Sequence, residues 1–237
     1  GAGPLRVEIM KEVSPRTVFV GDVHGCLAEL DALLKKLKLG SADRLIFVGD
    51  LCAKGPDSQG VVQRVRELGA DCVRGNHDEA VLRIRRSALQ GYEPVRPPKK
   101  THVKVAESLS QADWDWLEQL PLYLELPELG INVVHAGVVP GKPISKQHPD
   151  DLMTMRTLRP EGTASPKLED GVLWAPKYVG PPHVIFGHDA ISGLQRERFA
   201  TGIDTGCVYG RELTALVLPG HDLVQVRAKR TYKELGL

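Results

Sequence analysis

The chain repeats one pattern of hydrophobic and polar positions: a short apolar run, then glycine and Asp, Asn or His, in either order. Residues 44–48 (RLIFV) lead into Gly49-Asp50, which predicts a buried strand with Asp50 just past its carboxyl end. The same pattern closes the runs at 17–20, 72–74, 131–134 and 183–186. Because an open α/β sheet places its ligand crevice at the carboxyl ends of its strands, we expect these polar termini to meet around Asp50.

Leucines at helical spacing predict the first crossover between these strands. Residues 27–39 carry leucines at 27, 30, 34 and 37, with lysines mostly elsewhere and Gly40 as the expected stop, so this segment is predicted to be an amphipathic helix. Further helices are expected from Asp57 or Ser58 to Leu68, from Asn76 to Leu89, and over 103–120. Within the last of these, Trp114 and Trp116 are expected to pack the helix down rather than stack on bases.

The remaining sequence combines loops with more β structure. We expect a loop over 90–100, a strand over 122–126, and loops with one short helix around 151–158 within 145–171. Further strands are expected over 198–204, 213–218 and 223–228. The pattern therefore predicts an α/β fold tending towards α+β, with a β-sandwich core and flanking helices. Residues 17–237 are expected to form one domain, preceded by an N-terminal extension over 1–16.

Composition and charge narrow the class of protein without identifying it. The 237 residues are 42% hydrophobic and 26% charged, which is ordinary for a soluble globular protein with a sizeable core. The formal net charge is +1, so bulk electrostatics attract neither nucleic acid nor a membrane, and no DNA specificity is expected. No apolar run approaches the ~20 residues that cross a bilayer.

The N-terminus and the cysteines point to an intracellular protein. The opening GAGPLRVEIMKEV lacks the apolar stretch of a secretory signal, which predicts a cytoplasmic location. It also lacks an initiator Met, so the leading Gly-Ala-Gly is expected to be a remnant of expression or the cut edge of a longer protein. The cysteines at 26, 52, 72 and 207 show no CxxC spacing and are expected to be reduced packing residues.

Five polar motifs close the predicted strands, in the order GDVHG, GDLCAKG, GNHD, VVHAG and FGHD. Each alone is typical of a helix cap, a turn or a satisfied core histidine, but their conjunction favours a metal site. Two metal ions ~3.5–4 Å apart need a bridging carboxylate with oxygen and nitrogen ligands on either side. The expected ligands are Asp50 for the bridge, Asp22 and His24 for one ion, and Asn76, His135 and His188 for the other. Imidazole and carboxylate ligands without thiolates suit Mn²⁺, Fe or Zn²⁺.

The five motifs resemble those of the calcineurin-like metallophosphatases across residues 17–220. The opening GDVHGCxxEL, the element Leu117-Glu-Gln-Leu-Pro121 and the segment Ile203-Asp-Thr-Gly-Cys207 resemble the phosphoprotein phosphatase branch, and most nearly the eukaryotic ApaH-like phosphatases. The resemblance implies a metallophosphatase catalytic domain over 17–237 with two divalent ions, Mn²⁺ first and Zn²⁺, Fe or Co²⁺ as alternatives. It also implies the same six metal ligands.

The resemblance further implies roles around those ligands. His77 corresponds to the proton donor to the leaving oxygen, a role that suits an imidazole near its working pH. Arg74 and Arg156 correspond to phosphate clamps, with a surface salt bridge as the alternative for Arg156.

One departure from the family pattern bears on the substrate. Protein Ser/Thr phosphatases carry Asp-Arg where this chain has Ala53-Lys54, a pair that resembles the ApaH-like group. Ala53 lacks the carboxylate that would orient His77, and a lysine is a poor substitute for the forked guanidinium. A leaving group that is itself a phosphate needs less help from a general acid than an alkoxide does, which favours phosphoanhydrides over phosphoserine. The alternative is that Asp78 takes over the missing role.

These observations predict a hydrolase that cleaves phosphoanhydride bonds by direct attack of a metal-bridging hydroxide. Lys54 and Arg74 would neutralise phosphoryl oxygens, and His77 would protonate the departing group. The expected partner is a phosphate-rich small molecule, such as a dinucleoside tetraphosphate, or a capped RNA 5′ end, which would make the protein a decapping enzyme. Inorganic polyphosphate, a phosphorylated protein, and a catalytically silent scaffold are the alternatives. The oligomeric state is left open.

The stretch from Arg83 to Lys104 is strongly basic. It holds seven Arg or Lys residues, at 83, 85, 86, 96, 99, 100 and 104, against the single acid Glu93. Two interpretations are equally favoured: a solvated face, or an electropositive wall that holds a polyanionic substrate.

Overall fold

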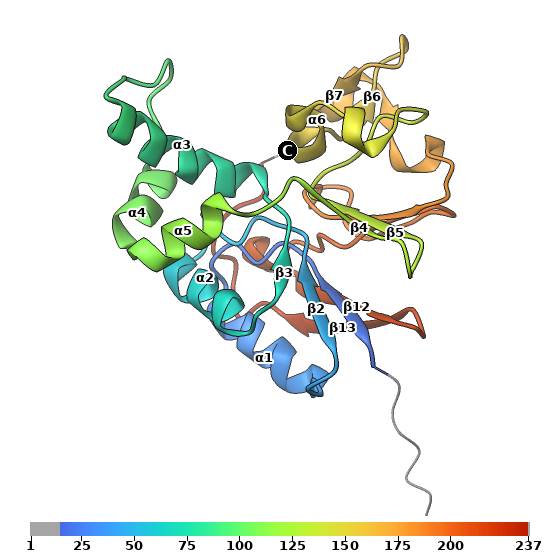
Figure 1. The fold of residues 1–237 in the computed structure, drawn as a ribbon, viewed down its shortest axis with the longest axis horizontal. Helices are drawn as coiled ribbons and strands as arrows, with labels where there is room; N and C mark the ends of the chain where they lie inside the picture. Colours follow the sequence, from blue (N-terminus) through green and yellow to red (C-terminus); the bar gives the residue numbers. More distant parts are fainter. Residues whose placement is uncertain (1–14, 237) are drawn as a thin grey trace, which may run out of the picture.

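The computed structural model describes residues 15–236. Most of the predicted N-terminal extension, residues 1–14, and the last residue lie outside the described part of the chain. The described chain forms two five-stranded sheets, a small three-stranded sheet and flanking helices (Figure 1). The predicted α/β fold with a β-sandwich core is therefore confirmed.

The first sheet is mixed. Its strands, in spatial order, are β13 (Asp222–Arg227), β12 (Glu212–Leu218), β1 (Thr17–Val20), β2 (Arg44–Phe47) and β3 (Asp71–Cys72). Strands β1, β2 and β3 run parallel, while β12 is antiparallel to both β1 and β13. The carboxyl ends of the three parallel strands therefore open at the same edge.

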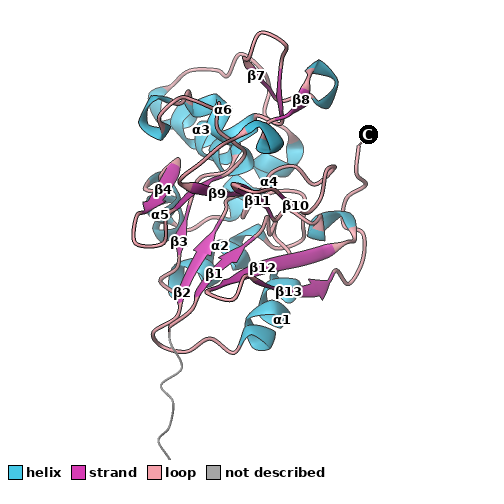
Figure 2. Ribbon diagram, turned by 90° about the vertical axis from the view of Figure 1, so that its right-hand side faces the viewer, coloured by secondary structure: helices cyan, strands magenta, loops and turns pink. Residues whose placement is uncertain are grey.

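The second sheet is also mixed and lies over the first (Figure 2). Its strands, in spatial order, are β10 (Gln195–Arg196), β11 (Ala200–Gly202), β9 (His183–Phe186), β5 (Ile131–Val134) and β4 (Tyr123–Leu126). Strands β5, β9 and β11 are parallel. Each of the five strands that the sequence predicts to end in a metal ligand thus belongs to one of these parallel sets.

Helices flank the first sheet on one side (Figure 1). They are α1 (Leu27–Leu37), α2 (Ser58–Glu67), α3 (Asn76–Gln90), α4 (Lys100–Ser108) and α5 (Gln111–Glu118). At the other end, α6 (Pro149–Thr154) accompanies the small sheet of β6 (Thr157–Leu158), β7 (Ala164–Ser165) and β8 (Val172–Leu173). Short 3₁₀ turns lie at 144–146, 168–170, 175–177 and 207–209.

Alternation along the strands builds a layered core. In β1, Val18 and Val20 face the helices while Phe19 faces the second sheet. The layer between the sheets takes Phe19 and Ile46 from one side and Val133 and Ile185 from the other. Side chains of period two therefore fill both faces of the first sheet, and this fixes the register that brings the strand ends together.

Several predicted helix limits are wrong, each for a local reason. The helix expected over 103–120 is two helices, because Ser110 and Asp113 form a capping box that starts a new helix. The short helix expected around 151–158 spans 149–154 instead, starting at Pro149, a residue preorganised for the first turn. Helix α1 ends with Lys38 in a left-handed conformation, before the expected stop at Gly40.

The predictions that the two tryptophans and the four cysteines are packing residues agree with the structure. Trp114 and Trp116 are partly buried against the helix-side core, and the four cysteines are buried as free thiols. Within the described residues, none of the helices has the length and apolar character to cross a membrane.

Candidate metal centre and active-site cleft

The predicted ligands lie on five loops, each directly after a parallel strand. Asp22 and His24 follow β1, Asp50 follows β2, Asn76 opens α3 after β3, and His135 and His188 follow β5 and β9. Because β1, β2 and β3 belong to one sheet and β5 and β9 to the other, neither sheet alone assembles the set. The site exists where the two sheets face each other.

One group of donor atoms consists of Asp22, His24 and Asp50. All three side chains are buried, and their donor atoms lie within 4.8 Å of one another. The Nε2 atom of His24 is 3.9 Å from Asp22 Oδ2 and 3.5 Å from Asp50 Oδ2. A single cation could therefore contact all three.

The second group shares Asp50 and adds His135 and His188, again with donor atoms within 4.8 Å. His135 Nε2 lies 3.2 Å from Asp50 Oδ2 and 3.0 Å from Asn76 Oδ1. The amide oxygen of Asn76 is thus beside the same group. Asp50 is the one residue common to both groups, which is the position of a bridging carboxylate.

Backbone carbonyls orient the imidazoles. His24 Nδ1 is 2.9 Å from the carbonyl of Cys52, and His135 Nδ1 is 2.7 Å from the carbonyl of Val48. A carbonyl can only accept, so each Nδ1 carries a hydrogen, and Nε2 is left as the ring nitrogen that could bind a metal ion. In His188 the two ring nitrogens exchange roles: Nε2 lies 3.0 Å from the carbonyl of Thr154 and carries the hydrogen, so Nδ1 is left as the possible metal ligand.

The backbone is strained at three of these positions. His24, Asp50 and His188 adopt positive φ angles of 45°, 54° and 72°. A left-handed conformation costs a non-glycine residue about 1–2 kcal/mol, and such strain concentrates at functional sites. The fold is therefore less stable than it could be at these three positions, and in exchange the three side chains point into the site.

Glycines beside the ligands permit close approach of the loops. A Cβ atom on Gly75 would lie 2.1 Å from Asp50 Oδ1, and one on Gly187 would lie 2.1 Å from Asp22 Oδ1. Gly75 has an ordinary φ of −88°. Glycine is therefore required at this position because a side chain would not fit, and not because of the backbone conformation. The recurring glycine in the sequence pattern has this physical basis.

Asp78 organises the loop that carries Asp50. Its Oδ2 accepts from the backbone N–H groups of Asp50 (2.8 Å) and Gly75 (2.9 Å), and its Oδ1 accepts from those of Leu51 (3.0 Å) and Cys52 (3.2 Å). Burial, then the charge of Asp50, raises the pKa of Asp78 to about 6. The carboxylate is committed to four backbone donors, which does not favour Asp78 as the orienting partner of His77.

The electrostatics of the centre fit divalent cations. Burial, with the neighbouring carboxylates of Asp204 and Asp50, raises the pKa of Asp22 well above its ordinary value. Burial opposes ionisation of Asp50 too, but the surrounding imidazoles, led by His135, outweigh it and hold its pKa well below its usual range. Crowded buried carboxylates beside oriented imidazole nitrogens are groups that suit Mn²⁺, Fe or Zn²⁺.

A cleft of about 370 Å³ opens over this centre. Besides the ligands, it is lined by His77, Lys54, Arg156, Tyr209 and the segment 233–236. Burial lowers the pKa of His77 to about 2, against the attraction of Asp50, so its ring is neutral at neutral pH unless an anion lies beside it. His77 Nδ1 is 2.9 Å from His102 Nε2, a contact that no sequence motif indicated.

Two predicted cationic groups line the cleft. Lys54 Nζ is 2.5 Å from the hydroxyl of Tyr209 and 5.1 Å from the centroid of its ring. Arg156 donates to the carbonyl of Pro166 and lies 3.6 Å from Asp189. Nε of Arg156 is buried and is the atom that faces Asp189 Oδ1, so only the terminal nitrogens of its guanidinium can reach a ligand in the cleft.

Arg74 does not line the cleft. Its guanidinium lies 3.1 Å from Glu79 Oε2 and donates to the carbonyl of Glu118 at 2.8 Å. A buried arginine paired in this way holds α3 against α5, and freeing it would leave Glu79 without one of its cations. The structure therefore gives no support to Arg74 as a phosphate clamp, and we leave it out of the proposed substrate contacts.

The basic segment 83–104 also lies away from the cleft, since none of its seven cationic residues lines it. Arg83 and Arg86 pair with Glu79, and Arg85 lies 4.0 Å from Asp115 and over the ring of Trp114. These contacts favour the first interpretation of this segment, a helix surface with local ion pairs, over an electropositive wall at the metal centre.

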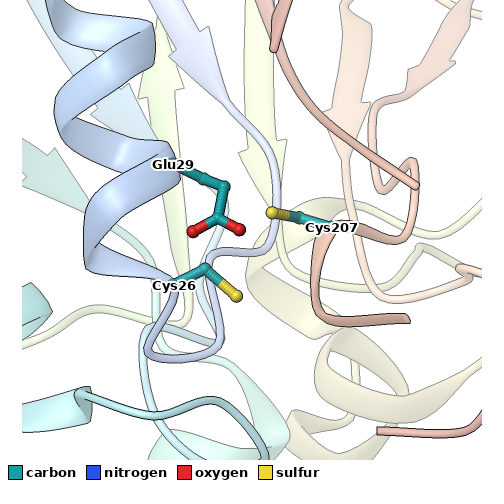
Figure 3. Close-up of side chains that lie close together, drawn as sticks. All are labelled: Cys26, Glu29 and Cys207. Atoms are coloured by element: carbon teal, nitrogen blue, oxygen red, sulfur yellow. The ribbon is translucent and has the colours of Figure 1, made fainter. Parts of the chain in front are cut away.

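The C-terminal segment lines the cleft, and the chain that leads to it contacts a buried cluster of Cys26, Glu29 and Cys207, which lie close together (Figure 3). Glu29 lies beside Cys26 and Cys207, and it accepts hydrogen bonds from the Tyr232 hydroxyl and the backbone N–H of Lys229, both at 3.1 Å. Contact with Cys26 and burial raise the pKa of the Cys207 thiol, so the thiol stays protonated. The cluster fixes the chain that leads to 233–236. Helical periodicity marks Glu29 only as an interior position and gives no signal for this role.

Comparison with known proteins agrees with the fold and gives the class of protein, a metal-dependent phosphoesterase. A model of the calcineurin-like phosphoesterase family matches residues 15–225, and the chain belongs to that family. The resemblance drawn from the motifs is thereby confirmed at the level of the family.

The relatives narrow the comparison further. An asymmetrical bis(5′-nucleosyl)-tetraphosphatase, PrpE, from Oceanobacillus iheyensis is 30% identical over 234 residues, covering 90% of this chain and 92% of that protein. A symmetrical bis(5′-nucleosyl)-tetraphosphatase from Shewanella baltica is 44% identical over 126 residues, covering 52% of this chain and only 44% of that protein. The chain is related to these enzymes; the narrower assignment to the eukaryotic ApaH-like group stays a prediction.

Solved structures give the same result. The crystal structure of a candidate diadenosine tetraphosphatase superposes with a TM-score of 0.81 at 38% identity, covering 92% of this chain and 95% of that one. A protein serine/threonine phosphatase from Saccharomyces cerevisiae superposes with a TM-score of 0.58 at 14% identity. The second likeness concerns the fold alone.

Proposed function

We propose that the protein hydrolyses the phosphoanhydride bonds of dinucleoside polyphosphates, with dinucleoside tetraphosphates as the first substrate to test. The observation that carries this proposal is the relative named as a bis(5′-nucleosyl)-tetraphosphatase, which matches 90% of the chain. The cleft supports it independently, because it combines cationic side chains with the buried ligand groups around Asp50.

The six side chains of the two groups would hold two divalent ions, for which Mn²⁺ is our first choice. These are Asp22, His24, Asp50, Asn76, His135 and His188. Such ions, when bound, would lower the pKa of a water molecule and offset charge on phosphoryl oxygens. The fixed ring orientations and the strained loops prepare this arrangement before a ligand arrives.

The remaining cleft residues would act on the substrate. Lys54 and Arg156 would bind phosphoryl oxygens, Lys54 as a compact charge steadied by Tyr209 and Arg156 through the terminal nitrogens of its guanidinium. His77 would give the proton from its Nε2 to the departing phosphate oxygen. A polyphosphate supplies the negative charge that the His77 ring needs in order to carry that proton.

The absence of a side-chain carboxylate at Ala53 supports an anhydride substrate rather than a phosphoprotein. A departing phosphate is a weaker base than an alkoxide, so it depends less on a general acid. Lys233, from the C-terminal segment, adds a further cation to the cleft lining, which suits a chain of several phosphates. A capped RNA end and inorganic polyphosphate share this chemistry and are therefore included in the test.

A phosphate-release panel with Mn²⁺ tests the proposal. We would compare diadenosine tetraphosphate, a cap analogue, long-chain polyphosphate and a phosphopeptide, each with the wild type and Asp50→Asn. We expect the dinucleotide to be cleaved fastest and the variant to lose about 10³-fold or more in kcat/KM, because it removes the shared carboxylate. Preference for the phosphopeptide would overturn the proposal, and full activity of the variant would exclude Asp50 as the bridge.

A further inference from the structure

His77 lines the cleft, but its ring is anchored from outside it. The residue lies in the first turn of α3, where its backbone N–H donates to Asp50 Oδ1 at 2.9 Å. Its Nδ1 is engaged by His102 Nε2 at 2.9 Å. Imidazole has two ring nitrogens, so Nε2 is the atom left to serve the cleft.

His102 reaches this position from a different helix. It lies on α4, which packs beside α3 (Figure 1), and only 6% of it is exposed. The two ring centroids are 5.1 Å apart with an angle of 44° between the planes. Within residues 15–236, the bond to His77 is the only hydrogen bond that the His102 ring makes, so a buried polar ring has one partner, and that partner is at the active site.

Neither alternative on the chain can orient the His77 ring. Position 53, where the protein phosphatases carry a carboxylate, is an alanine buried without a polar side chain. Asp78 has both carboxylate oxygens occupied by four backbone N–H groups. In this chain, the group that contacts Nδ1 of His77 is therefore the imidazole of His102 on α4.

We propose that His102 is the positioning residue of this hydrolase: its Nε2 holds the His77 ring so that Nε2 of His77 faces the leaving group. This inference rests on the proposed function. In the step it supports, the Nε2–H bond of His77 breaks and an O–H bond forms on the departing oxygen, whose bond to phosphorus has broken. The hydrogen on Nδ1 of His77 stays in its bond to His102 throughout, so no further proton moves.

Aryl phosphates whose leaving groups differ in basicity separate positioning from a structural role. Phenyl phosphate needs a proton donor more than para-nitrophenyl phosphate does, because phenolate is the stronger base. With Mn²⁺, we expect His102→Ala to lower kcat for phenyl phosphate about tenfold more than for para-nitrophenyl phosphate, with KM changed by less than about twofold. His102→Gln, which keeps a hydrogen-bonding group, should recover part of the loss.

A double-mutant cycle tests whether His102 acts through His77. If it does, adding His102→Ala to His77→Ala should change kcat by less than about twofold, since the partner is already gone. Losses that multiply, or equal losses on both aryl phosphates, would overturn the proposal. His183→Ala is the matched control: its ring contacts Thr201 at 2.8 Å at the amino end of β9, and it should leave both rates unchanged.

A second measurement does not depend on turnover. Nitrogen NMR of the wild-type protein with Zn²⁺ should show a coupling across the hydrogen bond between Nδ1 of His77 and Nε2 of His102. This coupling should be lost in His102→Gln. The absence of any coupling in the wild type would contradict the geometry. The aryl series also separates the two proposals. Failure to cleave any anhydride would refute the proposed function, yet the leaving-group test would still decide the role of His102.

Discussion

Replacing Gly75 by alanine tests whether close loop approach sets the metal centre. The added Cβ would lie 2.1 Å from Asp50 Oδ1 and 2.3 Å from the Asp50 backbone nitrogen. Since one of these atoms is backbone, the clash cannot be relieved by a side-chain rotation alone. Ordinary contact begins near 3.4 Å, so the two loops must separate by about 1.3 Å (3.4 − 2.1), which far exceeds the ~0.2 Å tolerance of metal–ligand distances.

The expected effect is larger on metal binding than on folding. Overpacking of this kind costs about 1–3 kcal/mol of the free energy of unfolding, whereas a ~1 Å misplacement at a reacting centre costs about 10²-fold in rate. We therefore expect Gly75→Ala to remain folded, to bind Mn²⁺ about 10²-fold more weakly, and to lose activity in proportion. Calorimetric Mn²⁺ titration, urea unfolding and phosphate release measure these quantities on the same samples.

Gly40→Ala is the matched control, because its Cβ would meet only the side chain of Asp43, at an ordinary 3.6 Å or more. It should bind Mn²⁺ as the wild type does. Normal Mn²⁺ affinity in Gly75→Ala would refute the reasoning that loop contact holds Asp50 in place.

Two further predictions concern residues behind the centre. Asp78→Asn replaces one acceptor oxygen by a donor facing backbone N–H groups, so Mn²⁺ affinity should fall about 10–100-fold. Asp57→Asn, which changes the N-cap of α2, should not alter it, and wild-type affinity in Asp78→Asn would exclude the organising role. Burial raises the pKa of Glu79, but Arg86 and Arg74 lower it more strongly, so the folded-state pKa lies below the unfolded-state value of 4.5. The ionised Glu79 therefore contributes its full stabilisation above pH 4.5, and this contribution is lost as the pH falls through the folded-state pKa. Glu79→Gln should therefore cost about 2 kcal/mol at neutral pH, shrinking to nothing in acid; a pH-independent difference in urea unfolding would contradict the ion-pair account.

The meeting of these polar side chains could be predicted because its information is local. Each ligand follows a short apolar strand within a few residues, and parallel strands place their carboxyl ends at a common edge. Asp50 and its neighbours in sequence, Gly49 and the run 44–47, therefore specify both the strand and the position of the carboxylate. The family resemblance added that separate strands would contribute to one site.

Contacts between helices could not be predicted from the sequence in the same way. His102 lies on α4, and its periodicity indicates only a buried face, so the bond to His77 depends on how α4 packs on α3. Arg74 precedes the Gly75-Asn76 motif and was expected at the phosphate, but α5 brings the carbonyl of Glu118 to its guanidinium and turns it away. Ion pairs between helices are set by crossing geometry, which local sequence does not encode.

The sequence by itself thus determined which polar side chains follow each strand, the donor chemistry that they offer, and the family that the chain resembles. Tertiary structure alone decided which cations face the cleft, what orients His77, and that the C-terminal segment returns through Glu29 to line the site. The physical reason is the distance along the chain over which each kind of interaction acts. Alternation and turn residues act over a few positions and fix strand ends, whereas the surroundings of a side chain depend on packing between segments as far apart as residues 29 and 232.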